Sequence, residues 1–383
     1  MDSDDTPGLA GVVYWSALGV RRMAFHLRGI VLPDDEERDL YVAGDRITLE
    51  PLAGAEMVVD GGWLVPGLVD VHTHPGDQEP GDPLDESLLR QHGLQHRDAG
   101  VTLLRVPGSA ARLPAWFGHD AQLPRVYGAG PWLAAPGGFF PDWGRQVEVA
   151  ALPQVAVEEA TASGGWCKLI SDWGVGEGSE ERHEPTVPPE VLAEVVQRVH
   201  AAGGRVAVHS QHGESGAAAI AAGVDSLEHG MHLATELLDT MARQGTALVP
   251  TMLAMAGIPE ALARNPPPEP LRSWVEAGWA RHPGLVRAAY EAGVTLLAGT
   301  DSIGGERSPH GQVAQEIRWL ARAGVPAETA LAGGSWIARR WLGLPGLEEG
   351  APADVVAYAA DPRLDLEVLD QPSRVMLRGH VIR

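Results

Sequence analysis

The feature that most constrains the fold is a regular alternation of amphipathic helices with short apolar strands. A helix opened by two prolines has Leu192, Val195 and Val199 at helical spacing, and residues 205–209 follow it as a strand. The alternation continues with predicted helices over 216–222, over 235–243 and up to Tyr290, and with predicted strands over 224–228, 246–250 and 294–298. Such alternation gives a parallel sheet with crossover helices, and so many units favour a closed (β/α)8 TIM barrel of about 250 residues. The predicted fold class is therefore α/β.

The two ends of the chain have a different pattern, in which short extended runs alternate with turn residues. The runs cover residues 24–27, 39–42, 46–49 and 57–59 near the start, and 354–358 and 374–378 near the end. We expect both ends to pair into one small β-sandwich. The predicted domains are a β-sandwich part over 23–65, the (β/α)8 barrel over 66–344 and a second β-sandwich part over 345–383, with residues 1–22 unassigned. The proline-rich residues 265–270 are predicted to be a loop.

Charge and cysteine content exclude several classes of function. The net charge of −22 argues against nucleic acid or an anionic membrane surface as a partner, since both need a basic surface. A single cysteine excludes an internal disulfide. The acidic N-terminal residues differ from a basic secretory signal, and the apolar stretch over 9–20 is too short to span a bilayer. We therefore expect a soluble cytoplasmic protein that acts on a small-molecule substrate, either as a monomer or as a homo-oligomer.

Lys168 is the only lysine among 383 residues, and it lies in the apolar run 166–170, which is typical of a buried strand. A general preference for arginine explains why lysine is missing elsewhere, but not why the one exception is surrounded by apolar residues. Because a lone buried ammonium is costly, this side chain should be either neutralised or chemically altered. A neutral amine can capture CO₂ and become a carbamate, which is a negatively charged, bidentate metal ligand.

Two histidines end the strand predicted over residues 68–74. Side chains alternate along a strand, so His72 and His74 face the same side and can reach one metal at about 2.0–2.1 Å. Four further potential ligands end four further predicted strands: Lys168, His209, His229 and Asp301. Barrel enzymes build their active sites at the C-terminal ends of their strands. Each residue alone could be an ordinary buried polar group, but six metal-competent groups at one edge favour a shared metal site.

Five segments of the sequence carry a resemblance to a known family. They are residues 63–74 (WLVPGLVDVHTH), 167–170 (CKLI), 224–230 (VDSLEHG), 298–301 (AGTD) and 349–356 (EGAPADVV). Together these motifs resemble the amidohydrolase superfamily, in particular its imidazolonepropionase-like and metallo-dipeptidase (prolidase-like) branch with a carboxylated lysine. The resemblance extends from about residue 23 to the C-terminus.

The resemblance implies a binuclear metal centre with a defined ligand set. The more buried ion would be bound by His72, His74 and Asp301, the second ion by His209 and His229, and carboxylated Lys168 would bridge the two. An unmodified ammonium about 4 Å from a divalent ion would be repelled by several kcal/mol even at an effective dielectric constant near 20, which favours the carbamate. Imidazole and carboxylate ligands make Zn²⁺ the expected metal, although manganese, cobalt or iron can occupy such sites.

The resemblance also implies a mechanism and a class of reaction. A hydroxide that bridges the ions would attack the substrate, Asp301 would orient it and pass its proton to the leaving group, and the second ion, held by His229, would polarise the carbonyl. The expected catalytic residues are thus Asp301, His229 and Lys168. We expect hydrolysis of an amide-type C–N bond in a peptide-like or N-acyl amino acid substrate. The alternatives are a deaminase or cyclic-imide (imidazolone) hydrolase, a lactonase or phosphoesterase, and a non-catalytic scaffold protein; a bridging lysine disfavours the deaminases, which generally use one metal.

Six residues after the predicted strands are candidates for substrate binding. They are Phe139, Trp143, Trp173, Gln211, His212 and His310. Two of them depart from the family pattern, because Phe139 stands where many dipeptidases of this branch have a histidine, and Gln211 where some relatives have a substrate-contacting tyrosine. Both departures weaken a transfer of dipeptide specificity. Cys167, which adjoins Lys168 in the same strand, is predicted to point away from the metals and to pack in the core.

Overall fold

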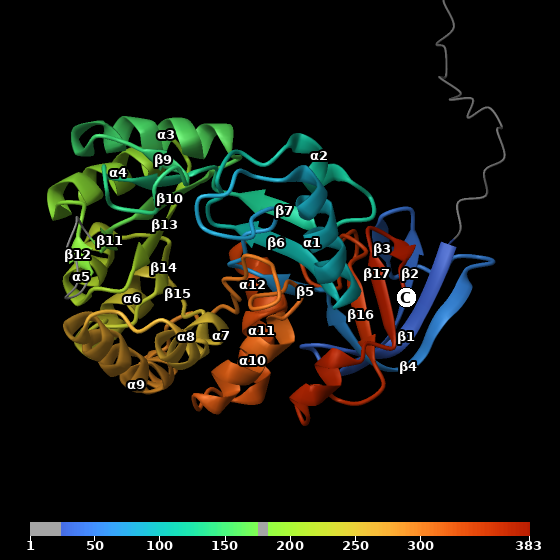
Figure 1. Cartoon of the computed structure of the whole chain (residues 1–383). Helices are drawn as coiled ribbons and strands as arrows, with labels where there is room; N and C mark the ends of the chain where they lie inside the picture. The colour runs from blue at the N-terminus through green and yellow to red at the C-terminus, as the bar shows by residue number, and fades with distance from the viewer. Residues whose placement is uncertain (1–23, 175–182) are drawn as a thin grey trace, which may run out of the picture.

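The computed structural model describes residues 24–174 and 183–383 of the chain. The segment over 1–22, to which the sequence assigns no structure, lies outside the described residues. Figure 1 shows two regions side by side, one of parallel strands flanked by helices and one made of strands from both chain ends. In the described parts of the chain, none of the helices combines the length and the apolar character that a bilayer crossing needs.

Parallel strands form the part of the molecule on which the predicted ligands lie. One sheet has the order β15-β14-β13-β10-β8-β9, and a second has the order β5-β6-β7. Neighbouring strands in both sheets are parallel. The bounds of these strands are β5 (Leu68–Asp70), β6 (Val101–Val106), β7 (Arg125–Gly128), β8 (Trp132–Ala134), β9 (Arg145–Gln146), β10 (Trp166–Ile170), β13 (Arg205–Ser210), β14 (Ser226–His229) and β15 (Ala247–Val249).

Helices connect successive strands and cover their outer side, as Figure 1 shows for α3 to α6 around β10 to β15. Helix α4 buries Leu192, Val195 and Val199 at the predicted helical spacing. The helices are α1 (Glu86–Asp98), α2 (Ala115–His119), α3 (Leu152–Ala162), α4 (Pro189–Ala201), α5 (Gly213–Ala222), α6 (Leu238–Gln244), α7 (Met252–Ala256), α8 (Ile258–Arg264), α9 (Glu269–Glu291), α10 (Val313–Arg322), α11 (Ala327–Gly333) and α12 (Trp336–Trp341). The predicted alternation of strands and helices is therefore present.

The side chains of β10 show how alternation along a strand selects the residue that faces the site. Cys167 and Leu169 belong to the large core cluster that the helices cover, whereas Trp166 belongs to a separate cluster with residues of the other parallel strands. Because successive side chains of a strand point to opposite faces, Lys168 lies on the same side as Trp166. Cys167 is fully buried and packs in the core, as predicted.

Strands from both ends of the chain pair in one seven-stranded sheet with the order β18-β17-β16-β4-β1-β2-β3. The central strand β4 pairs in parallel with β1 and antiparallel with β16, where Val356 is opposite Val65. The bounds are β1 (Ala24–Val31), β2 (Glu36–Ala43), β3 (Arg46–Thr48), β4 (Glu56–Pro66), β16 (Val355–Tyr358), β17 (Arg374–Leu377) and β18 (His380–Val381). The β-sandwich arrangement and the domain boundaries stay predictions.

Three local expectations differ from the structure. No regular strand covers 294–298, where Leu296 makes only an isolated parallel bridge to Leu248. Strand β5 ends at Asp70, so the two histidines that follow it lie just beyond its end. Part of the predicted loop over 265–270 is helical, because α9 begins at Glu269 with a proline in its first turn, where the missing N–H group costs no helical hydrogen bond.

Candidate active site

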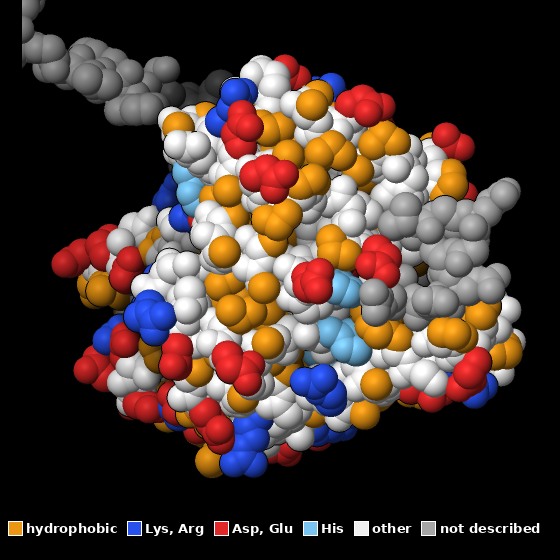
Figure 2. All heavy atoms as spheres, turned by 90° about the vertical axis from the view of Figure 1, so that its left-hand side faces the viewer, with side chains coloured by type: hydrophobic (Ala, Val, Ile, Leu, Met, Phe, Trp, Pro, Cys, Tyr) orange, Lys and Arg blue, Asp and Glu red, His pale blue; other side chains and the backbone are white. Residues whose placement is uncertain are grey.

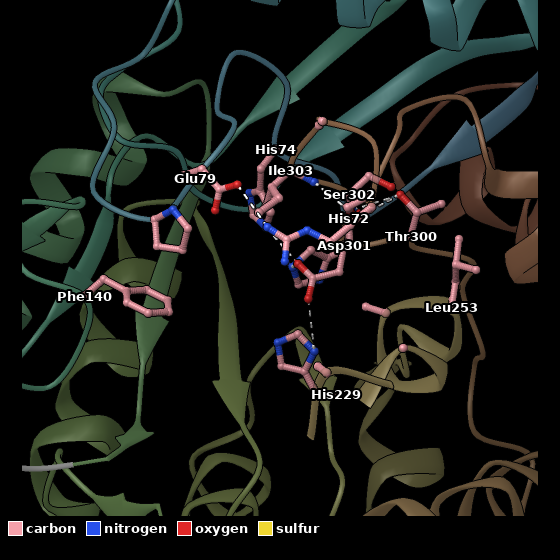
Figure 3. A pocket seen from close by; sticks show the side chains of 18 of the residues that line it. His72, His74, Glu79, Phe140, His229, Leu253, Thr300, Asp301, Ser302 and Ile303 are labelled. Atoms are coloured by element: carbon pink, nitrogen blue, oxygen red, sulfur yellow. Dashed lines mark hydrogen bonds and ion pairs between the residues drawn. The ribbon is translucent and has the colours of Figure 1, made fainter. Parts of the chain in front are cut away.

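All six predicted ligands lie close together near the C-terminal ends of the parallel strands, although Lys168 is the third of the five residues of β10 and Asp301 follows the irregular segment 294–298. All six line one cavity of about 590 Å³: His72, His74, Lys168, His209, His229 and Asp301. Figure 3 shows His72, His74 and Asp301 gathered at one side of this cavity, with the His229 ring facing Asp301 across it. Residues that are far apart in the sequence are thus brought to one place by the edge that parallel strands share.

Three of these side chains already converge on a common point. Oδ1 of Asp301 lies 3.2 Å from Nε2 of His72 and 3.1 Å from Nε2 of His74. Burial opposes ionisation of Asp301, but its interactions with His72, and then its hydrogen bond to His74, hold the pKa of this carboxyl well below its ordinary value. The carboxylate is therefore ionised at neutral pH, as a metal ligand or a proton acceptor must be.

Asp70 holds the two segments that carry these residues. Its carboxylate accepts hydrogen bonds from the backbone N–H (3.0 Å) and the hydroxyl (2.7 Å) of Thr300, and from the backbone N–H of His72 (3.2 Å). The backbone N–H of Asp301 donates to the carbonyl of His72 at 2.6 Å. The turn before Asp301 is in this way fixed directly against the end of β5.

The backbone is strained at two of the six positions. Asp301 has a φ of 55° and His229 has a φ of 66°, both in the left-handed region that non-glycine residues rarely adopt. Thr251, which contacts the His229 ring, also lies in this region with a φ of 47°. Strain of this kind persists only where the surrounding structure over-determines it, and it clusters at functional sites.

Partners on the far side of the ring orient His72 and His74. Nδ1 of His72 donates to Glu228 at 2.7 Å, and Nδ1 of His74 donates to the carbonyl of Gly108 at 2.8 Å. Nδ1 of His229 lies 2.8 Å from the hydroxyl of Thr251. A carboxylate or carbonyl behind the imidazole is typical of metal-ligating histidines, because it fixes the tautomer and leaves the other nitrogen to the metal.

Glu228 and Arg105 form a buried ion pair beneath the site. The guanidinium donates to Glu228 at 2.6 Å and 3.2 Å, and both side chains are at most 1% exposed. Burial would raise the pKa of Glu228, but Arg105, followed by Lys168 and His72, holds it well below its ordinary value. This pair was not predicted from the sequence, although charged residues inside the apolar runs of β6 and β14 are a signal that each needs a partner.

Lys168 and His209 provide the test of whether a metal fits this site. Nζ of Lys168 and Nε2 of His209 are buried polar atoms without a hydrogen-bond partner in the structure. Burial lowers the pKa of Lys168 to about 8 and that of His229 to about 3, and burial together with His229 lowers the pKa of His209 well below its ordinary value. Neutral imidazoles and a readily neutralised amine, left unpaired in a buried cavity, fit a site that binds metal ions.

Among residues 24–174 and 183–383, two groups of side chains have ligand atoms within 4.8 Å of one another. The first contains His72, His229 and Asp301, which combines two residues expected on the more buried ion with one expected on the second ion. The second contains Asp172, His183 and His209, of which only His209 is a predicted ligand. Asp172 is fully buried and accepts hydrogen bonds from the backbone N–H groups of Gln211 and His212 at 3.0 to 3.2 Å. It therefore fixes the loop after β13, and its place directly after the β10 strand is the signal that could have identified it.

The structure separates the six substrate-binding candidates into two sets. Phe139, Trp143, Trp173 and Gln211 line the cavity. His212 is instead the N-cap of α5, where Nδ1 accepts a hydrogen bond from the backbone N–H of Glu214. His310 is also not among the lining residues; it is buried with His92 and His96, and its Nδ1 lies 3.1 Å from the Thr73 hydroxyl. Neither histidine is placed to contact a substrate in the cavity.

Comparison with known proteins agrees with the fold and with the motifs at the site. The family model described as "Amidohydrolase family" matches residues 63–382. An uncharacterized protein of Mycobacterium tuberculosis is 38% identical over 367 residues, which cover 94% of this chain and 96% of that protein. The ochratoxinase of Aspergillus niger is 30% identical over 272 residues, which cover 68% of this chain and 52% of the ochratoxinase.

A solved structure shows the same fold at lower identity. The crystal structure of a Xaa-Pro dipeptidase with methionine in its active site superposes with a TM-score of 0.80 at 24% identity, over 94% of this chain and 99% of that one. This likeness supports the fold, while the family match, which spans most of the sequence, supports the class of enzyme. The chain belongs to the amidohydrolase family and is a hydrolase that acts on carbon–nitrogen bonds.

Proposed function

We propose that this protein is a binuclear metal-dependent hydrolase that cleaves an amide bond in a peptide-like or N-acyl amino acid substrate. The observation that carries the proposal is the set of six potential ligands around one cavity, two of which have buried nitrogens without a hydrogen-bond partner among the described residues. Unpaired buried polar atoms are costly, and a bound cation would satisfy them. The ochratoxinase and the Xaa-Pro dipeptidase are named for hydrolytic activities, which is consistent with this class of reaction.

The proposed ligand sets follow the contacts within the site. His72, His74 and Asp301 would hold one ion, because their ligand atoms converge within 3.2 Å. His209 and His229 would hold the second, since their rings lie 4.6 Å apart between centroids. Lys168, placed on the same side of β10 as the cavity, would bridge the two. Imidazole and carboxylate ligands favour zinc, as expected from the sequence.

Lys168 would act as a carbamate. Its neutral amine would attack CO₂, form an N–C bond and release one proton, which leaves a carboxylate in place of an ammonium. Burial favours this reaction, because it brings the pKa of the amine to about 8 and so increases its neutral fraction at neutral pH. The reaction would also remove the positive charge of an ammonium that the nearby Arg105 guanidinium disfavours.

Asp301 is the residue proposed to handle the proton of the attacking water. Two bound divalent ions would supply Lewis acidity, lowering the pKa of water and polarising the scissile carbonyl. The low pKa of Asp301 keeps it ionised, so it can accept a proton from water and return it to the leaving nitrogen. Its strained backbone and its hydrogen-bonded turn fix the carboxylate before substrate binds.

A closed (β/α)8 barrel is part of the same proposal. Backbone hydrogen bonds outside the regular strands connect the two parallel sheets: Leu248 N–H donates to Thr295, and Val71 N–H donates to Ala298. On the other side, Ser109 and Pro131 form a parallel bridge between the segments that follow β6 and β7. These contacts support a continuous ring of parallel neighbours in which all six ligands face the same end.

Metal content tests the proposal directly. We expect about two equivalents of divalent metal per chain by elemental mass spectrometry. His209→Ala should reduce the content by about one equivalent and abolish hydrolysis of N-acyl amino acids. His119→Ala is the matched control, because His119 lies at the exposed end of α2 and should leave both values unchanged. Less than one equivalent in the unaltered protein, after growth with added zinc, would refute the binuclear centre.

A further inference from the structure

One wall of the cavity consists of aromatic rings. This aromatic wall comprises Trp132, Phe139, Phe140, Trp143 and Trp173, all of which line the cavity. They come from β8, from the loop that follows it and from the end of β11 (Asp172–Trp173). Phe139 and Trp143 are buried, whereas Phe140 and Trp173 are only partly buried and present more of their ring surface to the cavity.

The aromatic wall runs without interruption between the two proposed metal positions. Ring centroids lie 4.9 Å apart between His74 and Trp132, and 5.5 Å apart between Trp132 and Phe139. The series of neighbouring rings continues from Phe139 to Trp173, whose centroids lie 4.9 Å apart, and from Trp173 to His209, whose centroids lie 5.5 Å apart. A substituent of a substrate whose carbonyl lay between His74 and His209 would therefore have these rings beside it.

The rings of the wall pack against one another. Trp143 stacks on Phe139 with an interplanar angle of 4° and packs against Trp132 at 4.4 Å. Phe140 meets Trp173 edge-on at 4.8 Å. Aromatic surfaces fixed in this way lose little conformational freedom on binding, so they favour a flat, rigid ligand.

The opposite side of the cavity is also apolar. Leu253 and Ala254 of α7 and Ile258 and Ala261 of α8 line it. In Figure 3, Phe140 and Leu253 lie on opposite sides of the space above His229. The substituent next to the metals is thus enclosed by apolar side chains on two sides.

The positively charged arginines of the cavity lie at its mouth. Arg307 is paired with Glu79 at 3.3 Å, and both side chains are mostly exposed; Arg264 lies 3.6 Å from Glu260 on the same helix. Figure 2 likewise shows Lys and Arg side chains only singly or in small groups among acidic ones on the face that it draws. An anionic group of a substrate would therefore remain near solvent, with the apolar group deeper in the cavity.

We propose that the aromatic wall binds an aromatic substituent of the scissile amide, so that aryl amides are preferred over aliphatic amides of equal size. This inference rests on the proposed hydrolase function and adds the substrate class to it. The preferred compounds are N-aroyl amino acids or amides of aromatic amines.

The test compares N-benzoyl-L-alanine with N-cyclohexanecarbonyl-L-alanine, which differ in the planarity and aromaticity of one ring. We expect kcat/KM for the benzoyl compound to be higher by about tenfold, the effect of two ring contacts. Trp173→Leu and Phe140→Leu should each reduce this ratio, and Trp116→Leu, at a partly buried ring outside the cavity, should not. Calorimetric titration of benzoate and of cyclohexanecarboxylate provides a second readout that needs no turnover.

The outcomes separate the two proposals. Hydrolysis of both compounds at equal rates, unchanged in Trp173→Leu, would overturn the aromatic preference and leave the hydrolase intact. Selective binding of benzoate that is lost in Trp173→Leu, without hydrolysis of any amide, would support the aromatic site and contradict the proposed function. Equal or absent binding of both acids, together with equal or absent turnover, would overturn the inference.

Discussion

Replacement of Glu228 by glutamine is the most direct test of how the site is supported. The carboxylate accepts hydrogen bonds from Arg105, from the Ser226 hydroxyl at 2.6 Å and from Nδ1 of His72. Glu228→Gln keeps the shape of the side chain but removes its charge. The change therefore leaves the Arg105 guanidinium buried without a counterion, and it replaces one acceptor oxygen by an NH₂ group.

The expected loss of stability can be worked out from this burial. Removing one partner of a buried ion pair costs about 3–5 kcal/mol, because the remaining charge is left uncompensated. At about 2.1 cal/mol/K per residue, the unfolding entropy of a chain of 383 residues is about 0.8 kcal/mol/K. Dividing the lost free energy by this entropy gives a fall in Tm of about 4–6 °C. Metal affinity should also fall by about 10–100-fold, because His72 loses the group that orients it.

The matched control is Glu37→Gln. Glu37 also pairs with an arginine, Arg28, at 2.8 Å, but both side chains are about half exposed or more. An exposed pair contributes about 0–1 kcal/mol, so this Tm should change by about 1 °C or less. Differential scanning calorimetry of both variants, with and without zinc, measures the effect. If the Tm of Glu228→Gln lies within about 1 °C of that of Glu37→Gln, the buried ion pair of Arg105 and Glu228 does not stabilise the folded protein.

Three further perturbations test other parts of the site. Lys168→Ala should lose bound metal and activity together, with partial rescue by acetate plus zinc; unchanged turnover would remove the lysine bridge from the mechanism. Asp301→Asn should retain its Tm within a few degrees while kcat falls by orders of magnitude, and full activity would mean that another residue is the base. Asp77 is fully buried without a hydrogen-bond partner, and burial raises its pKa from 3.8 to about 7. Because the pKa of Asp77 is higher in the folded state than in the unfolded state, protonated Asp77 contributes stability below pH 3.8, and this contribution is lost as the pH rises through 7. Chemical denaturation of Asp77→Asn should therefore show a smaller loss of stability between pH 5 and pH 8 than the unaltered protein, and equal losses would contradict the assignment.

The positions of the potential ligands followed from the sequence because two local rules determine them. Alternation along β10 places Lys168 and Cys167 on opposite sides, and the shared C-terminal edge of parallel strands brings His209 and His229 to one place. Neither rule requires knowledge of which strands are neighbours. The histidines therefore met around one cavity even where a strand ended earlier than predicted.

The partners behind the ligands could not be predicted in the same way. Arg105 and Glu228 are 123 residues apart, and only the tertiary structure brings them together. The environment of His310 could not be predicted either, because the local sequence is the same whether the histidine faces a cavity or, as here, packs against His92 and Thr73. The irregular segment at 294–298 had a strand-like apolar pattern, although a single bridge replaces the ladder. Such outcomes depend on long-range packing that overrides local preference.

The pairing of β4 has a consequence for how the protein is made. Its two neighbours come from opposite ends of the chain, and β16 begins only at Val355. During synthesis, one edge of β4 therefore keeps its N–H and C=O groups unpaired until Val355 and the residues after it have left the ribosome, roughly 290 residues after β4 itself. A strand edge exposed for that long can associate with other nascent chains, so β16 covers an edge that is otherwise prone to aggregation.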